Sequence, residues 1–594
     1  MDRIFERAAE WGIETQHVDG LGRRRVVEPQ VLARILDSMA AGGAAPPVTR
    51  PQASTRVLPQ QAYQGADGAP RRTWALAVQL YGVRSRRNWG HGDFTDLANL
   101  IELAATLGAA GIGLNPLHAL FDDRAQEASP YFPNSRFFLN PLYIDVEAVP
   151  EFPGVEAAGL TPELDALRAR EFVDYEAVAN AKARALALAF EVFRRRGDES
   201  RQRQFRRFRR ERAPLLAQFA AFEVLRRRFA KPWWEWPEEF RRPDAKCLKK
   251  LRRSDGEAVA QVEFVQWIAD QQLGACRERA RRLGLPIGLY LDIAVGVRAD
   301  GFDAWSDQSF ILPGIEIGAP PDLLNTQGQR WGLAGFNPVD LINRNCEPFR
   351  QVLRASMRHA GAIRLDHVLG LKRLYLIPRD VAADAGAYIR FPFEALLAAI
   401  AQESVANQCI VIGEDLGTVP EGFREMLAAW GLWSYQVMLF ERARDGGFNS
   451  PDRYRENALV TFATHDLPTF AGWISGHDLA VKRALGLDPG ESDQDRAAAK
   501  EALGRAMAWR GLPALDFPSV AKFLADTPSR LMVVSLEDAL GMLDQVNIPG
   551  TIEEHPNWRR RLPVDLEDLE HHSGLASVAN VIASAGRRIA MEGV

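Results

Sequence analysis

The stretch AIRLDHVLG, residues Ala362–Gly370, has the form of a buried strand that ends in functional groups. Its apolar residues enclose one arginine, Arg364, and the run ends in Asp366 and His367 before a glycine-ended loop. A charge inside such a run is costly to bury unless it is paired. In α/β barrels the catalytic residues stand at the C-terminal ends of the strands. The stretch therefore predicts a parallel strand with chemistry at its end.

Two later stretches repeat this form. CIVIGEDLGTVP (409–420) ends its apolar run in Glu414, and ALVTFATHDLPT (458–469) ends its run in His465 and Asp466. A single acid at a strand end is usually a helix cap or a loop hydrogen bonder. Three such acids in one barrel, with Arg364 two residues before Asp366 and on the same side of its strand, instead predict one site.

The same kind of apolar run occurs five more times, at 74–83, from 111, and at 284–295, 434–441 and 529–538. Helical patterns lie between the runs, such as the one after Asp93, a suitable N-cap. Eight buried strands that alternate with helices predict an α/β protein with a closed (β/α)8 TIM barrel. A doubly wound sheet is the alternative, although it does not require eight strands.

The remaining segments suggest a domain organisation around this barrel. Residues 1–45 show helical spacing and are expected to form a short helical N-terminal extension, followed by an Ala/Gly/Pro-rich linker at 46–73. The catalytic barrel would then span 74–594. Residues 146–285 read as a mostly helical subdomain, a large insertion after the second strand.

Composition narrows the range of functions. The formal net charge of −4 gives no reason to expect nucleic acid or an anionic membrane as a partner. The four cysteines are scattered, and no apolar run approaches the roughly 18 residues of a membrane span, so a cytoplasmic protein is expected. The arginine-rich segment 201–212 is interleaved with Phe205 and Phe208, which favours a solvated helix face over a nucleic-acid site. No metal-binding or cofactor motif is present, and we expect neither a metal nor a cofactor.

Clustered acids of this kind indicate a reaction class. Close carboxyl groups split their pKa values, so that one is ionised and another protonated near neutral pH. Glycoside cleavage needs this pair, because one carboxylate attacks while one carboxylic acid protonates the departing oxygen.

The motifs RLDH, GEDLGTVP and THDLP resemble the catalytic segments of the 4-α-glucanotransferases of the amylomaltase (disproportionating enzyme) family, glycoside hydrolase family 77. The resemblance extends over nearly all of the chain from Trp74 onward. It includes the motifs QLYGVRSRRNWGHGDFTDL, SPYFPNSRFFLNPLYID, GAPPDLLNTQGQRWG and NIPGTIEEHPNWRRRLP. The N-terminal segment also resembles the extension of some bacterial members, in a shorter form.

The resemblance implies catalytic roles for three acids. Asp366 matches the nucleophile, Glu414 the acid/base, and Asp466 the third acid, which holds the hydroxyls of the reacting sugar. Arg364 would then orient Asp366, and His465 would bond the same sugar ring.

The resemblance also implies sugar-binding residues. The segment 312–335 resembles an active-site loop whose contacts would be Asp322, Gln329 and Trp331. The other matching positions are Ser129, Tyr131, Asp292 and Asn547. Taken alone, Trp331 could equally be a packing residue, and Asn547 could belong to a plain turn.

The expected function is that of a 4-α-glucanotransferase, which moves α-1,4-glucan segments from maltooligosaccharides to glucose or to another glucan with retention of configuration. The alternatives are a hydrolase of the same bonds and an inactive glucan-binding protein. Transfer requires a lid that limits water at the intermediate, and the region around Trp331 is the candidate.

Overall fold

The computed structural model describes residues 2–40, 60–66, 72–124, 126–196, 198–322, 325–512 and 514–589. Most of the linker expected at 46–73, namely residues 46–59 and 67–71, lies outside the described residues.

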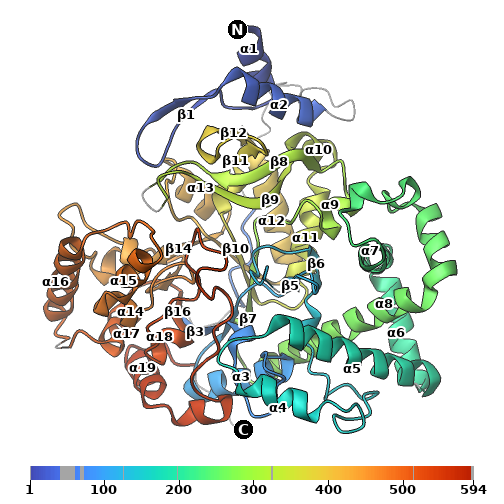
Figure 1. The fold of residues 1–594 in the computed structure, drawn as a ribbon. Coiled ribbons are helices and arrows are strands. Elements are labelled where there is room, and N and C mark those ends of the chain that lie inside the picture. Colours follow the sequence, from blue (N-terminus) through green and yellow to red (C-terminus); the bar gives the residue numbers. More distant parts are fainter. Residues whose placement is uncertain are drawn as a thin grey trace.

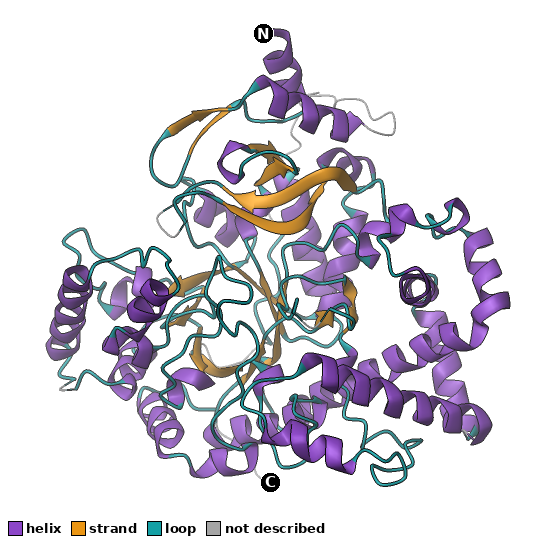
Figure 2. Cartoon of the chain, in the orientation of Figure 1, coloured by secondary structure: helices purple, strands orange, loops and turns teal. Residues whose placement is uncertain are grey.

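A closed barrel of eight parallel strands forms the centre of the molecule (Figures 1 and 2). Around the barrel, the strands follow the order β10-β13-β14-β15-β16-β3-β4-β7. Their bounds are β3 (Thr73–Val78), β4 (Gly111–Leu114), β7 (Gly288–Ile293), β10 (Ala362–Leu365), β13 (Ile410–Gly413), β14 (Trp433–Val437), β15 (Ala458–Thr461) and β16 (Leu531–Ser535). The predicted (β/α)8 barrel is confirmed. The second strand, predicted from residue 111, ends at Leu114, where the chain leaves the barrel.

Helices surround these strands. Asp93 caps α3 (Phe94–Leu107) in a capping box with Asp96, as the sequence suggests. The other helices of the barrel region are α9 (Phe302–Ser306), α10 (Pro338–Asn343), α11 (Glu347–Met357), α12 (Phe393–Asn407), α13 (Phe423–Ala429), α14 (Phe470–Ser475), α15 (His477–Ala484), α16 (Asp493–Trp509), α17 (Phe517–Ala525), α18 (Leu536–Ala539) and α19 (Ser573–Ser584).

The barrel closes where its first and last strands, β3 and β16, pair in parallel. Behind this seam the buried side chain of Arg587 donates hydrogen bonds to the carbonyl oxygens of Thr73 and Ser529, at 3.0 and 2.8 Å. The same guanidinium bonds the carbonyls of Ala525 and Thr527. One arginine therefore satisfies four backbone oxygens at the closure of the barrel.

A helical insertion separates β4 from β7, and it lies to the right in Figure 1. A short hairpin, β5 (His118–Ala119) and β6 (Ser135–Leu139), precedes it. The insertion consists of α4 (Thr161–Ala169), α5 (Tyr175–Arg196), α6 (Glu199–Glu211), α7 (Leu215–Phe229) and α8 (Ala245–Arg282). Within the described residues, no helix is both long enough and apolar enough to cross a membrane.

A four-stranded antiparallel sheet stands above the barrel, in the order β12-β11-β8-β9. Its strands are β8 (Ile311–Ala319), β9 (Gln329–Phe336), β11 (Arg373–Pro378) and β12 (Ala387–Arg390). The segment 312–335, expected as a loop, is therefore mostly a β-hairpin. The glycines and prolines of this segment obscured the alternation of Ile311, Ile315 and Ile317, which face the core.

Residues 2–40, here called the N-terminal unit, cover this sheet (Figure 1). The unit contains α1 (Asp2–Glu10), β1 (Gln16–Val18), β2 (Arg24–Val26) and α2 (Pro29–Ala40). Its two helices agree with the expected helical extension, whereas the β1–β2 hairpin between them was not predicted. The unit and the sheet share a hydrophobic core that is separate from the core around the barrel.

Candidate active site

Three neighbouring barrel strands bring the first acids together. In the parallel ladders, Arg364 of β10 lies beside Asp292 of β7, and Leu365 lies beside Gly413 of β13. Asp366 and Glu414 each follow directly after their strands. Residues that the sequence separates by more than a hundred positions thus meet at the same end of the barrel.

Arg364 is the centre of a buried ion-pair network. Its Nη1 lies 2.9 Å from a carboxylate oxygen of Asp292 and 3.0 Å from one of Asp366. The hydroxyl of Tyr131 donates to Asp292 at 2.5 Å. Burial alone would lower the pKa of Arg364, but the two aspartates outweigh it and hold the pKa well above its ordinary value. The arginine therefore stays charged and fixes the side chain of Asp366.

Glu414 is held differently from Asp366. Its two carboxylate oxygens accept hydrogen bonds from the backbone N–H groups of His367 and Leu416, at 2.9 and 3.0 Å. The first of these bonds comes from a histidine in the left-handed region, with φ of 48°. Burial raises the pKa of Glu414 to about 7, with a further contribution from the charge of Asp366. Glu414 can therefore hold and release a proton near neutral pH.

The third acid, Asp466, stands on the loop after β15. Its carboxylate lies 3.3 Å from Nε2 of His465 and accepts a hydrogen bond of 2.6 Å from Nδ2 of Asn547. Burial would raise the pKa of Asp466, but His465 and Asn547 outweigh it and lower the pKa. The ring of His465 stacks on Tyr131 with centroids 4.7 Å apart, so this loop joins the network of Asp292 and Arg364.

The β8–β9 hairpin brings Trp331 to the same region. The indole ring packs edge-on against His367, the residue after Asp366, with ring centroids 5.2 Å apart. Gln329 accepts a hydrogen bond of 3.2 Å from Nε1 of Trp331. Ser129 bonds the backbone N–H of Tyr131 and so supports that ring. Asp322 lies in the connection after β8, against Gly20 of the N-terminal unit.

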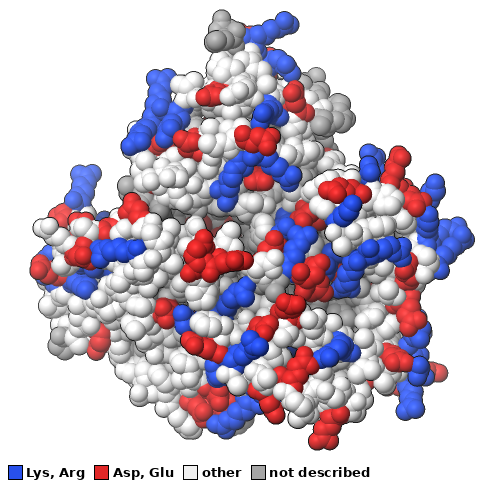
Figure 3. All heavy atoms as spheres, viewed as in Figure 1, with Lys and Arg blue, Asp and Glu red and all other residues white. Residues whose placement is uncertain are grey.

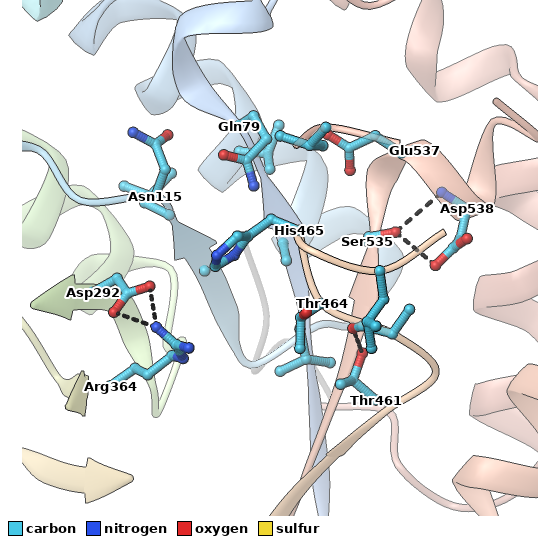
Figure 4. A pocket seen from close by; sticks show the side chains of 18 of the residues that line it. Gln79, Asn115, Asp292, Arg364, Thr461, Thr464, His465, Ser535, Glu537 and Asp538 are labelled. Carbon is cyan, nitrogen blue, oxygen red and sulfur yellow. Dashed lines mark hydrogen bonds and ion pairs between the residues drawn. The ribbon is translucent and has the colours of Figure 1, made fainter. Parts of the chain in front are cut away.

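A pocket lined by Tyr131, Asp292, Arg364 and His465 extends into the barrel (Figure 4). In Figure 4, Asp292 and Arg364 lie on one side of it, and Glu537 and Asp538 lie on the opposite side. Four of the lining residues were not predicted: Gln79, Asn115, Glu537 and Asp538. Burial raises the pKa of Glu537 to about 7. Glu537 and Asp538 are the second and third residues after β16 and end the predicted run 529–538, so the strand-end rule, applied to this strand as well, would have identified them.

The arginine-rich segment forms helix α6. Phe205 and Phe208 face the core, while Arg201 and Arg209 pair with Glu151 and Glu263, both at 2.8 Å. Basic and acidic side chains are interspersed over the face drawn in Figure 3. Among the described residues, no group of three or more His, Cys, Asp or Glu side chains is arranged to hold a metal ion.

The strand ends of this parallel barrel carry an aspartate that is paired with an arginine and, beside it, a glutamic acid that can hold a proton. This fold and these two groups are typical of the carboxylate-dependent enzymes that act on glycosidic bonds. The sequence profile of the 4-alpha-glucanotransferases, glycoside hydrolase family 77, matches residues 78–567. The chain belongs to this family. The expected family and enzyme class are thereby confirmed.

Individual relatives agree with this assignment. The 4-alpha-glucanotransferase of Mycobacterium tuberculosis is 37% identical over 553 residues, which cover 87% of this chain and 76% of that protein. The enzyme of the same name from Haemophilus influenzae is 34% identical, covering 85% of this chain and 78% of its own length. The crystal structure of amylomaltase from Corynebacterium glutamicum superposes with a TM-score of 0.84 at 28% identity, covering 99% of this chain and 100% of that one. Amylomaltase from Streptococcus agalactiae in complex with acarbose has a TM-score of 0.72 at 20% identity over 87% of this chain and 100% of its own, which shows a shared fold.

Proposed function

We propose that Asp366 and Glu414 carry out a double displacement that moves α-1,4-glucan segments from a donor maltooligosaccharide to glucose or a glucan. Asp366 attacks the anomeric carbon of the donor while Glu414 gives its proton to the departing glycosidic oxygen. Glu414, now ionised, then takes a proton from the acceptor hydroxyl, which attacks the same carbon and releases Asp366. Two inversions at one carbon retain the α configuration.

The contrast between the two acids is the observation that supports this assignment. Asp366 lies 3.0 Å from the charged Arg364 and is oriented by it, which suits a nucleophile. Glu414 is buried, with no arginine of the described part of the chain in hydrogen-bond contact, and its pKa of about 7 suits a group that must donate and then accept a proton.

The remaining predicted residues are assigned to the sugar. Asp466, held by His465 and Asn547, would accept hydroxyl groups of the reacting ring, and Tyr131 would offer its aromatic face. Asp292 would orient Arg364 and Tyr131. Ser129, Asp322, Gln329 and Trp331 would contact the sugars on either side.

Trp331 also bears on the choice between transfer and hydrolysis. The ring projects from a hairpin over His367 and is half-buried, so it can cover the intermediate and receive the apolar face of an acceptor sugar. Limiting water there would favour transfer.

We propose that the enzyme works on the maltodextrin or glycogen pool of the cytoplasm. All four cysteines are free and buried, which is consistent with a reducing compartment.

The test is to incubate the purified enzyme with maltotriose and to follow chain lengths and total reducing ends. Transfer predicts a ladder of longer oligosaccharides plus glucose, with little rise in reducing ends. The Asp366→Asn variant should lose the ladder. Glucose and maltose with rising reducing ends would identify a hydrolase. An unchanged substrate, with longer donors also unchanged, would favour a binding protein.

A further inference from the structure

The turn between β1 and β2 of the N-terminal unit touches the β8–β9 hairpin at Gly20. The backbone N–H of Gly20 donates to the carbonyl of Pro321 at 2.8 Å. A Cβ atom on Gly20 would lie 2.6 Å from the Cβ and 2.9 Å from the Cα of Asp322. The backbone of Gly20 is not in the left-handed region, so only this close approach requires a glycine.

The turn that carries Gly20 is itself fixed. The buried carboxylate of Asp19 accepts hydrogen bonds from the backbone N–H groups of Leu21 and Arg23, at 3.0 and 2.8 Å. The Nε of Arg25 adds a third bond to Asp19 at 3.0 Å. If Gly20 carried a side chain, the turn could move away from Asp322 only by breaking these hydrogen bonds. The β8–β9 hairpin would therefore move as well.

The N-terminal unit is anchored at the opposite edge of the same sheet. The backbone N–H of Glu14 donates to the carbonyl of Tyr388 at 2.8 Å, and the carbonyl of Gly12 accepts from the backbone N–H of Arg390 at 3.0 Å, both residues of β12. The carboxylate of Glu14 also pairs with Arg373 at 2.8 Å. The sheet has the strand order β12-β11-β8-β9. The N-terminal unit thus contacts the edge strand β12 and also the segment that joins β8 to β9.

The strand beyond this contact leads to the catalytic acids. β9 carries Trp331, whose ring lies against His367 beside Asp366. The next residue, Gly332, lies close to the ring of Phe132, which limits how β9 can adjust. Because Ala319 of β8 pairs with Gln329 of β9, a displacement at Pro321 and Asp322 would reach Trp331 through the paired strands of the hairpin.

We propose that Gly20 is a positioning residue, through which the N-terminal unit sets the place of the β8–β9 hairpin and so the partition between transfer and hydrolysis. The inference rests on the proposed function of Trp331. It adds that a segment outside the barrel determines how well the acceptor sugar is held.

The test compares Gly20→Ala and Gly20→Val with Val18→Ala, a control on the same turn-bearing hairpin whose side chain is 58% exposed. We expect the transfer-to-hydrolysis ratio on maltotriose to fall about fivefold in Gly20→Ala and further in Gly20→Val, because sub-ångström misplacement of a positioning group is costly. The KM for the glucose acceptor should rise, while the rate of donor cleavage stays within about twofold. Amide hydrogen exchange should increase in peptides covering Gln329–Phe336 and stay at the wild-type level in the barrel strands. Val18→Ala should match the wild type.

Three results would overturn the proposal. The first is a folded Gly20→Val protein in which both the transfer-to-hydrolysis ratio and the amide hydrogen exchange of β9 are unchanged. If the valine variant does not fold, the same result in Gly20→Ala counts. The second is increased exchange throughout the barrel, which would indicate general destabilisation. The third is an equal effect of Val18→Ala. A wild-type enzyme that makes no ladder would instead contradict the proposed function, and the exchange measurement would still decide whether Gly20 positions the hairpin.

Discussion

Glu414→Gln should change stability in a pH-dependent manner. Burial raises the pKa of Glu414 to about 7 from an ordinary value of 4.5. Between these values the folded protein binds the proton more tightly than the unfolded chain does, so the free energy of unfolding falls as pH rises. At about 1.4 kcal/mol per pH unit, the ionisation of Glu414 lowers the free energy of unfolding by about 3 kcal/mol above pH 7 and has no effect below pH 4.5. Glutamine does not ionise, so the variant does not lose this free energy as pH rises.

An opposing effect is present at every pH, because the amide NH2 group accepts no hydrogen bond, whereas a carboxyl oxygen can accept one in either protonation state. The two oxygens of Glu414 accept from His367 N–H and Leu416 N–H, whereas an amide offers one acceptor. One backbone N–H therefore loses its partner, at a cost of about 1–3 kcal/mol. The variant should be less stable than the wild type at pH 4.5 and equal to it or slightly more stable at pH 8.

Urea unfolding at a series of pH values from 4.5 to 8.5 would measure this difference. Glu537→Gln is the matched comparison. Burial also raises the pKa of Glu537 to about 7, but its only recorded hydrogen bond among the described residues is to its own backbone. It should show the same pH-dependent gain without the loss at low pH. A stability difference between Glu414→Gln and the wild type that does not change with pH would refute the reasoning. Glucan transfer by Glu414→Gln should fall by about 10²–10⁴-fold, as expected for loss of a general acid.

Two further substitutions test the surroundings of the acids. Trp331→Ala should lower the transfer-to-hydrolysis ratio about two- to tenfold, since an aromatic contact contributes about 0.5–1.5 kcal/mol beyond its buried area. Product analysis on maltotriose measures this ratio. An unchanged ratio would exclude the hairpin from acceptor binding. Asn547→Ala removes the 2.6 Å bond that helps to lower the pKa of Asp466. The acid limb of kcat/KM should therefore move to higher pH, and a limb that stays in place would mean that Asp466 need not be ionised.

The strand ends could be predicted from sequence because parallel strands of a barrel all end on one rim. The apolar runs before Asp366 and Glu414 are each recognisable alone, and closure of the barrel brings their ends together. The partner of Arg364 could not be predicted in this way. Its pairing with Asp292 depends on the register between two neighbouring strands, which places these two residues side by side and which no local pattern in either strand encodes.

The β8–β9 hairpin shows a second limit. Its strands are interrupted by glycine and proline and have register shifts, so they lack the regular alternation that identifies a strand. The contact between Gly20 and Asp322 joins segments about three hundred residues apart and leaves no local pattern in the sequence. Close approach of two backbones is a property of the assembled sheet.

The pairing of β3 with β16, sealed by Arg587, has a consequence for biosynthesis. More than four hundred residues separate these two strands, so β3 leaves the ribosome long before its partner exists. At about 5–20 residues per second, the interval is roughly 20–90 s. During that time one edge of the nascent sheet has no strand to pair with, and such an edge can pair with another chain. The growing polypeptide should therefore depend on chaperones until the last strand is made.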